Sequence, residues 1–213
     1  MTIEIKICGL TNRHDAEAAI EIGADYLGFV FYKKSVRAVS VSQVSKMRAD
    51  LPAGVRCVGV FVNEPVARVL EIVGECSLYA AQIHGDEQAE EFRRMGLRIW
   101  RAVKLVAGQW QPALEQWPAE RYVADAAVAG QYGGTGVAGD WAAAACLAAR
   151  WPVMLAGGLN PDNVSDAVRL VRPAGLDVAS GVESAPGRKD LEKMRRFIDN
   201  ARETAALLKG PPR

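Results

Sequence analysis

The sequence has little histidine and no excess of charge of either sign. Only two histidines, His14 and His84, occur among 213 residues, and neither stands near a second histidine or a cysteine cluster at zinc- or iron-site spacing. Lys and Arg number 26 against 25 Asp and Glu, and no block of like charge would follow a nucleic-acid backbone or an anionic membrane. The sequence therefore predicts no bound metal and no nucleic-acid partner.

Paired cysteines and long apolar runs are also missing. The four cysteines are widely spaced, at Cys8, Cys57, Cys76 and Cys146. They form no Cys-x-x-Cys pair in a chain too large to need a disulfide scaffold, which is typical of reduced thiols in a cytosol. The first apolar stretch contains Glu4 and Lys6, unlike a signal peptide, and no apolar run reaches membrane-spanning length. These features predict a cytoplasmic protein without a membrane segment.

What the sequence does contain is an alternation of short apolar runs and longer amphipathic stretches. Strands are predicted over residues 3–8, 25–31, 55–62, 78–85, 97–105, 121–126, 152–158 and 175–181. Helices are predicted over residues 13–23, 41–51, 64–74, 86–96, 140–151, 160–171 and 189–208. Proline and tryptophans in residues 106–118 permit only a short helix there. Eight such units without a linker favour one α/β domain over residues 1–213, a (β/α)₈ TIM barrel, over a doubly wound sheet.

Residues capable of acid–base chemistry follow two of the predicted strands. Cys8 ends the first strand directly before Gly9, where a thiol faces either substrate or the protein interior. Asp125 ends the sixth strand and precedes the glycine-rich residues 126–139, which are capable of closing as a lid. A helix cap or a satisfied carboxylate at the rim is the alternative role for Asp125. Because all carboxyl ends of barrel strands meet at one rim, both groups are active-site candidates.

Glycines mark the loops after the seventh and eighth strands. Gly157, Gly158 and Gly181 allow a bound group to approach the backbone closely, and N–H groups at a helix start attract anions. Tight turns are the alternative, but these two loops are the recurrent phosphate position in this fold. We therefore predict a phosphate site there, with Ser180 among its substrate-binding residues.

Two further rim residues each have two roles that fit the sequence. Arg37 lies in the loop after the second strand, where its planar fork is suited to a carboxylate, although a lone loop arginine is more often solvated. His84 follows the fourth strand and either contacts substrate or makes a structural hydrogen bond, the second being favoured. The remaining cysteines, Cys57, Cys76 and Cys146, are predicted to be packing residues.

The chain resembles the phosphoribosylanthranilate isomerase family over essentially its whole length. The motifs that carry the resemblance stand in the family's order: KICGLTN, GADYLGFVFYKKSVRAVS, GVFVN, QIHGDE, VADAAVAGQYGGTGVAGDW, AGGLNPDNV and DVASGVESAPGRKD. The resemblance implies an enzyme on the path to tryptophan that converts N-(5-phospho-β-D-ribosyl)anthranilate into 1-(2-carboxyphenylamino)-1-deoxy-D-ribulose 5-phosphate without a cofactor. It also implies a stand-alone isomerase rather than one fused to a second enzyme.

By the same resemblance, Cys8 matches the general base, Asp125 the general acid and Arg37 the residue that holds the anthranilate carboxylate. A thiol base has to be partly ionised, so a lowered pKa is expected for Cys8. Two positions depart from the family pattern: Ala179 replaces a frequent serine, and Gly139 replaces a usual aromatic residue. These departures would weaken a phosphate contact or loosen the lid.

Alternatives remain at this point. Related bifunctional enzymes that also process a histidine-pathway aminoaldose have an aspartate in place of Cys8, so the cysteine favours the single-substrate enzyme. A sugar-phosphate epimerase would need metal ligands, and a non-catalytic sensor of a phosphorylated metabolite would need neither Cys8 nor Asp125. A small-molecule substrate and a monomer are expected, with a homodimer left open.

Overall fold

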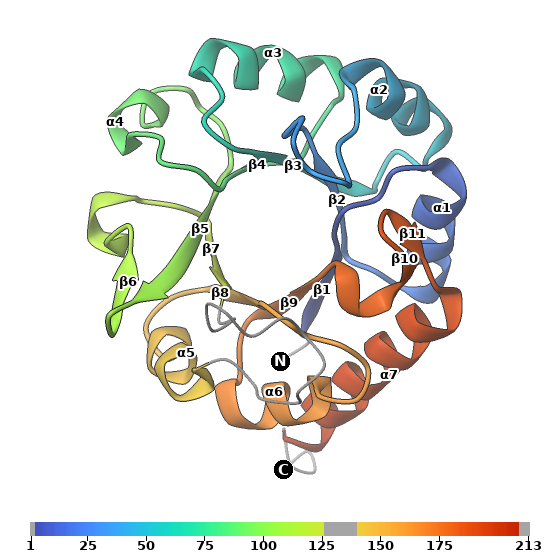
Figure 1. The fold of residues 1–213 in the computed structure, drawn as a ribbon, viewed down its shortest axis with the longest axis vertical. Coiled ribbons are helices and arrows are strands. Elements are labelled where there is room, and N and C mark those ends of the chain that lie inside the picture. The colour runs from blue at the N-terminus through green and yellow to red at the C-terminus, as the bar shows by residue number, and fades with distance from the viewer. Residues whose placement is uncertain (1–2, 126–139, 209–213) are drawn as a thin grey trace.

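Eight parallel strands close into a barrel in the computed structural model, which describes residues 3–125 and 140–208 (Figure 1). The barrel strands are β1 (Glu4–Ile7), β2 (Tyr26–Val30), β3 (Arg56–Phe61), β4 (Ala80–Ile83), β5 (Ile99–Val106), β7 (Arg121–Asp125), β8 (Val153–Ala156) and β9 (Gly175–Val178). Neighbours along the chain pair in parallel, β1 also pairs with β9, and the β4–β5 pairing completes the ring. The predicted (β/α)₈ barrel is therefore confirmed.

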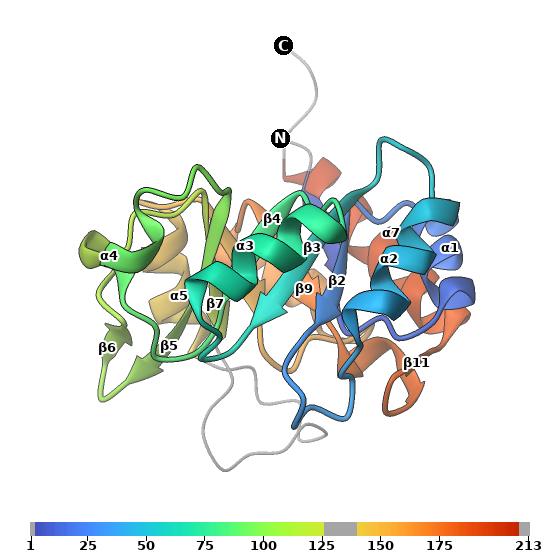
Figure 2. The ribbon, with the colours of Figure 1, turned by 90° about the horizontal axis from the view of Figure 1, so that it is seen from above.

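Helices surround this ring on the outside (Figures 1 and 2). They are α1 (Arg13–Ile22), α2 (Val41–Asp50), α3 (Val66–Glu75), α4 (Ala89–Phe92), α5 (Trp141–Ala148), α6 (Val164–Val171) and α7 (Leu191–Leu207). No helix within the described ranges is both long and apolar enough to cross a membrane. Each helix returns the chain to the amino end of the next strand, so every strand points in the same direction.

Two connections differ from the sequence-based expectation. The helix predicted over residues 86–96 is reduced to one turn, because its first residues form a loop held by Asn63. The backbone N–H of Asn63 donates to Glu87 Oε1 at 2.6 Å, and Asn63 Oδ1 accepts from the N–H of Asp86 at 2.6 Å. After β5, positive φ angles at Ala107 and Gly108 turn the chain back into a hairpin. This segment forms the antiparallel strand β6 (Gln109–Gln111) and the 3₁₀ turn η1 (Leu114–Gln116).

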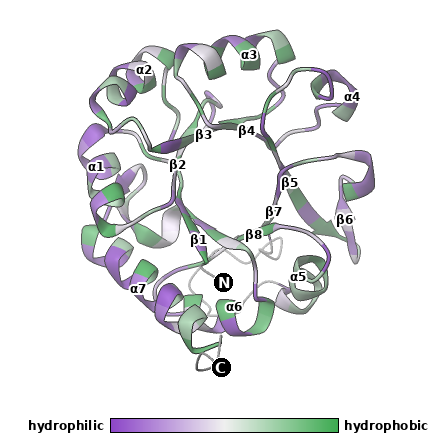
Figure 3. Cartoon of the chain, turned by 180° about the vertical axis from the view of Figure 1, so that it is seen from behind, coloured by the Kyte–Doolittle hydropathy of each residue, from purple (hydrophilic) through white to green (hydrophobic). Residues whose placement is uncertain are grey.

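The core has two layers because side chains alternate along each strand. Outward-facing residues of the strands pack against the helices, and Figure 3 shows hydrophobic and hydrophilic bands along α1, α2 and α7, as expected for amphipathic helices. The interior of the barrel holds a separate apolar cluster of Tyr26, Val58, Ala80, Trp100, Ala102, Val123 and Met154. The barrel is thus filled by side chains and is not a pore.

Polar side chains occupy the end of the barrel where the strands begin. Glu4 accepts from the Tyr26 hydroxyl at 2.9 Å and from Arg121 Nη2 at 2.6 Å. The guanidinium carbon of Arg56 lies 4.0 Å from the centre of the Tyr26 ring, a cation–π contact. Residues from four strands therefore contact one another at this end, and the opposite end remains for a functional site.

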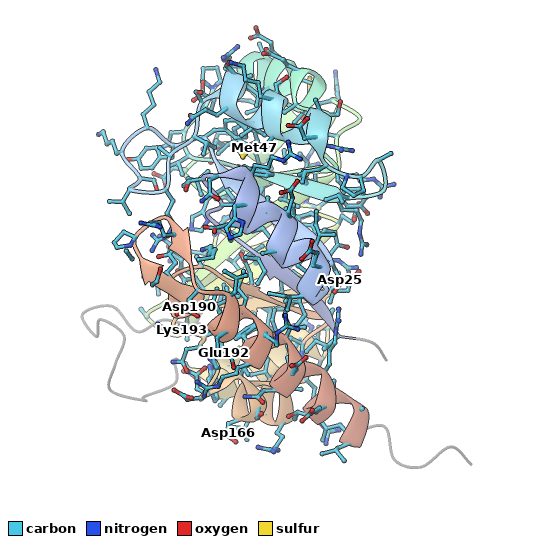
Figure 4. All side chains as sticks on the ribbon, turned by 90° about the vertical axis from the view of Figure 1, so that its right-hand side faces the viewer. Asp25, Met47, Asp166, Asp190, Glu192 and Lys193 are labelled. Carbon is cyan, nitrogen blue, oxygen red and sulfur yellow. The ribbon has the colours of Figure 1, made fainter. Side chains whose placement is uncertain are left out.

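The chain after β9 forms a compact corner at that opposite end. It comprises the 3₁₀ turn η2 (Ser180–Val182) and a small hairpin of β10 (Glu183–Ala185) and β11 (Arg188–Lys189), which lies at the lower edge of Figure 2, as the β5–β6 hairpin does. The hairpin is tied to α1, since Asp15 accepts from the backbone N–H of Lys189 at 2.8 Å. Asp190 then caps α7 by accepting from the Lys193 N–H, and both residues stand at the start of that helix in Figure 4.

Gly28 on β2 tests how tightly the interior is packed beside Cys8. A Cβ atom added at Gly28 would lie 2.7 Å from Cys8 Sγ and 2.9 Å from Lys6 Cε. We therefore expect Gly28→Ala to lower the free energy of unfolding by about 1–3 kcal/mol through overpacking, as measured by urea titration. Gly54→Ala is the control, because a Cβ there meets nothing within 4 Å. Equal urea midpoints for the two variants would contradict this packing.

Candidate functional site

A cavity of about 500 Å³ opens at the carboxyl ends of the strands. Six of the eight residues predicted for the site line it: Cys8, Arg37, His84, Gly157, Gly158 and Ser180. They come from five separate parts of the chain, as expected for a barrel whose strands all end at the same rim. The volume lies within the usual range for a small-molecule site.

Cys8 directly follows β1 and is 8% exposed at the cavity wall. Its backbone N–H donates to the carbonyl of Val178 at 2.8 Å, and its sulfur lies 3.4 Å from Lys6 Nζ. Burial raises the pKa of the thiol, while the charge of Lys6 acts in the opposite direction. The lowered pKa expected from the sequence is therefore wrong for this structure, because the loss of hydration outweighs the nearby cation.

Lys6 is one of the site residues that were not identified from the sequence. Its side chain is fully buried inside the barrel, where Nζ donates to Asp177 Oδ2 at 2.9 Å and to Gln82 Oε1 at 2.7 Å. In the sequence Lys6 served only as an argument against a signal peptide. The spacing nevertheless indicated its position: Lys6 and Cys8 are two residues apart on a strand, so their side chains face the same side of the sheet.

His84 both lines the cavity and makes a structural hydrogen bond. Its Nδ1 lies 3.2 Å from Gln82 Nε2. Because Lys6 can only donate, it fixes Gln82 Oε1 toward itself and leaves the Gln82 amide to donate to His84. The ring therefore carries its proton on Nε2. Burial lowers the pKa of His84, and the positive charge of Lys104 adds to that shift, so the ring is neutral.

Asp125 is the last residue of β7 and is half-buried. It shares the inward face of the strand with Val123, two residues earlier in the barrel core. Its neighbours in register are Lys104 on β5 and Ala156 on β8, both of which line the cavity. The strand geometry thus directs Asp125 toward the cavity rim. The glycine-rich segment predicted to form a lid, including Gly139, lies outside the described residues.

Arg37 is held in place rather than solvated. Its Nε and Nη2 atoms donate to the two carboxylate oxygens of Glu183, each at 2.7 Å, in a bidentate ion pair. Glu183 also accepts from Lys189 Nζ at 2.9 Å. These contacts lower the pKa of Glu183 despite its burial. Glu183 and Lys189 were not identified from the sequence, because the ion pair joins residues 146 positions apart.

The loops after β8 and β9 approach each other closely. Gly157 and Gly158 have φ angles of 93° and 66°, which favour glycine. A Cβ at Gly181 would overlap the carbonyl of Leu159, so glycine is required for the two loops to meet. Ala179 lines the cavity between them, and its carbonyl accepts from Lys189. Gly157 and Gly158 therefore line the cavity, whereas Gly181 lies behind it, where the two loops meet.

The other cysteines lie away from this cavity. Cys57 and Cys76 are buried, as predicted, and burial raises the pKa of each thiol to about 11. Cys146 is exposed on α5, so its assignment as a packing residue is wrong. Nothing in the sequence of that alanine-rich helix indicated which face is covered. Within residues 3–125 and 140–208, no three histidine, cysteine or acidic side chains are grouped as metal ligands.

Comparison with known sequences gives consistent results. A sequence model of the family described as N-(5'phosphoribosyl)anthranilate (PRA) isomerase matches residues 5–200. The N-(5'-phosphoribosyl)anthranilate isomerase of Magnetococcus marinus is 46% identical over 198 residues, covering 93% of this chain and 94% of that protein. The enzyme of the same name from Geobacter sulfurreducens is 42% identical over 200 residues, covering 94% and 98%.

Solved structures agree with the sequence matches. Phosphoribosyl anthranilate isomerase from Thermotoga maritima superposes with a TM-score of 0.84 at 36% identity, covering 94% of this chain and 99% of that chain. Phosphoribosyl anthranilate isomerase in complex with reduced 1-(o-carboxyphenylamino)-1-deoxyribulose 5-phosphate gives a TM-score of 0.80 at 35% identity, covering 94% and 99%. By fold, by sequence and by the length matched, the chain belongs to the phosphoribosylanthranilate isomerase family.

Proposed function

We propose that this protein isomerises N-(5-phospho-β-D-ribosyl)anthranilate to 1-(2-carboxyphenylamino)-1-deoxy-D-ribulose 5-phosphate, and that residues 1–213 act as one catalytic domain. Family membership supports the reaction. The observation that carries the proposal is the cavity itself, where Cys8 and the paired glycine loops share one wall and Asp125 lies at the rim. Such a cavity accommodates a substrate with an anionic group at each end and a sugar between them.

The two ends of the substrate would bind on different elements. The phosphate is assigned to the loops after β8 and β9, with Gly157, Gly158, Gly181 and Ser180, where backbone N–H groups are suited to an anion. The anthranilate carboxylate is assigned to Arg37, whose Nη1 atom is not used by Glu183. Holding both ends would place the ribose carbons near the thiol and the rim carboxyl group, which lowers the entropic part of the barrier.

The chemistry then needs one acid and one base. Asp125 would donate a proton to the furanose ring oxygen, so that the C1′–O bond breaks and a protonated Schiff base forms. Cys8, as a thiolate, would remove the C2′ proton, and the electron pair would move to the C1′–nitrogen unit as an enolamine. Loss of the enol proton and protonation at C1′ give the ketone. No cofactor is required, because the substrate's own nitrogen accepts the electrons.

Several narrower statements belong to the same proposal. Cys8 in place of an aspartate favours activity on the anthranilate substrate alone, and comparable turnover of the histidine-pathway aminoaldose by purified protein would contradict this. A sensor lacking catalysis would bind the phosphorylated anthranilate sugar without converting it.

Cytoplasmic location fits the four free cysteines. A monomer is expected, and light scattering distinguishes it from the homodimer.

Replacing the acid or the base tests the mechanism directly. Cys8→Ala and Asp125→Ala should each reduce kcat by about 10²- to 10⁴-fold, the usual contribution of general acid–base catalysis. The loss of fluorescence of freshly prepared phosphoribosylanthranilate measures turnover, and circular dichroism verifies folding. Cys146→Ala, at an exposed thiol outside the cavity, is the matched control and should keep full activity. Near-normal turnover in either test variant would refute the assignment.

Glu183 should act on substrate affinity through Arg37. Glu183→Gln weakens the bidentate pair that orients the guanidinium, so KM should rise roughly tenfold, the value of one charged hydrogen bond, with a smaller change in kcat. Steady-state kinetics with the anthranilate substrate measure both constants. Glu203→Gln on the exposed face of α7 is the control. An unchanged KM for Glu183→Gln would contradict this role.

The pH dependence follows from the burial of Cys8. Because burial raises the pKa of the thiol, the thiolate is the minor form at neutrality, and its fraction increases with pH. We expect kcat/KM, which reports on groups of the free enzyme, to rise between about pH 6 and pH 8. In Cys8→Asp that rise should disappear, since a carboxylate is already ionised there. A flat profile in the unmodified protein would rule out the thiolate base.

A further inference from the structure

Lys6 places a charged ammonium group in the centre of the barrel, where burial of a charge is unfavourable. Its side chain has no exposed surface and lies between β1, β4 and β9. Removing an ammonium group from water costs several kcal/mol unless partners replace the water. An apolar residue of similar length would fill the same space without that cost. The contacts of Nζ therefore indicate what the charge does.

The ammonium group has three N–H donors, and three acceptors surround it. Two are strong oxygen acceptors, Asp177 Oδ2 at 2.9 Å and Gln82 Oε1 at 2.7 Å. The third is Cys8 Sγ at 3.4 Å. A neutral thiol is a weak acceptor, whereas a thiolate is a full negative charge, so this contact becomes strong only when Cys8 ionises. The hydrogen bonds to Asp177 and Gln82 hold Nζ beside the sulfur of Cys8.

The charges around Cys8 also favour a thiolate. Three cations, Lys6, Arg37 and Lys189, and one carboxylate, Asp177, act on Cys8. A second carboxylate, Glu183, is paired with Arg37 and Lys189. One positive charge is left over when Cys8 is a neutral thiol, and ionisation of Cys8 neutralises it. On the remaining sides, Gly28 of β2 brings no charge, and the neutral His84 of β4 reaches Lys6 only through Gln82.

We propose that Lys6 is a positioning residue whose ammonium group stabilises the Cys8 thiolate, with Asp177 and Gln82 holding that group in place. This inference rests on the proposed function, in which Cys8 is the base. It assigns the buried ion pair a catalytic purpose: Lys6 partly offsets the effect of burial on the thiol. After Cys8 accepts the C2′ proton, the Lys6–Asp177 pair remains balanced, so the neutral thiol is also accommodated.

Alkylation of Cys8 without substrate tests the proposal separately from turnover. The rate of iodoacetamide modification is followed at the Cys8 peptide by mass spectrometry from about pH 6 to pH 10, across the usual range of thiol ionisation. Exposed Cys146 in the same molecule serves as the internal reference. Because burial already raises the pKa of Cys8, the upward shift expected for Lys6→Met, roughly one to three pH units for one adjacent cation, is read as an alkylation rate about 10- to 1000-fold lower at a given pH within this range.

The opposite variant makes the test specific. Asp177→Asn removes the carboxylate that competes for Lys6, so the Cys8 midpoint should fall, while Lys6→Arg should remain near the unmodified protein. A purely structural ion pair would leave the midpoint unmoved or shift it in the same direction in both variants, and either result overturns the proposal. If Lys6→Met does not fold, Lys6→Met/Asp177→Asn removes both charges and should still show an upward shift, because Lys6 lowers the pKa of Cys8 more than Asp177 raises it.

Turnover distinguishes this proposal from the one on which it rests. If Cys8→Ala keeps full activity, the general-base assignment fails, and the opposing alkylation shifts still measure the effect of Lys6 on the thiol. If Cys8→Ala is inactive and Lys6→Met leaves both the alkylation midpoint and kcat unchanged, only the role of Lys6 is overturned. The expected result is a fall in kcat for Lys6→Met that higher pH partly restores.

Discussion

Closure of the sheet into a ring, in which β4 pairs with β5 and β1 with β9, is the constraint on which the site depends. In a closed parallel ring every strand ends at the same rim, so residues from distant parts of the chain meet there without long loops. Cys8, His84 and the loops after β8 and β9 share one cavity for this reason. Were β4 and β5 unpaired, the first four strands would have no fixed relation to the last four on that side.

The same closure creates an interior in which polar groups are scarce and strongly coupled. Lys6, Gln82, His84 and Asp177 form one connected set of hydrogen bonds beneath the cavity. Each donor or acceptor limits the next, so the cation of Lys6 sets the amide orientation of Gln82 and, through it, the tautomer of His84. The floor of the cavity is therefore fixed before any ligand enters.

A second polar set fixes the wall of the cavity. Arg37, Glu183 and Lys189 join the loop after β2 to the hairpin that follows β9. Asp15 extends this set to the first helix. The guanidinium group is held in one orientation by a bidentate pair, which reduces the rotamer entropy lost when a ligand binds to it. The orientation of Arg37 thus relies on Glu183, which is itself held by Lys189.

The sequence by itself determined the strand–helix alternation, the barrel, and the rim positions of Cys8 and Asp125, because hydrophobic period and glycine placement are local properties. It left the shortened fourth helix, the hairpin after β5 and the exposure of Cys146 undetected. Only the tertiary structure decided the two ion pairs, since Lys6 and Asp177 are 171 positions apart and Arg37 and Glu183 are 146 apart. Such pairs depend on which side chains face each other across the closed ring, and no short stretch of sequence contains that information.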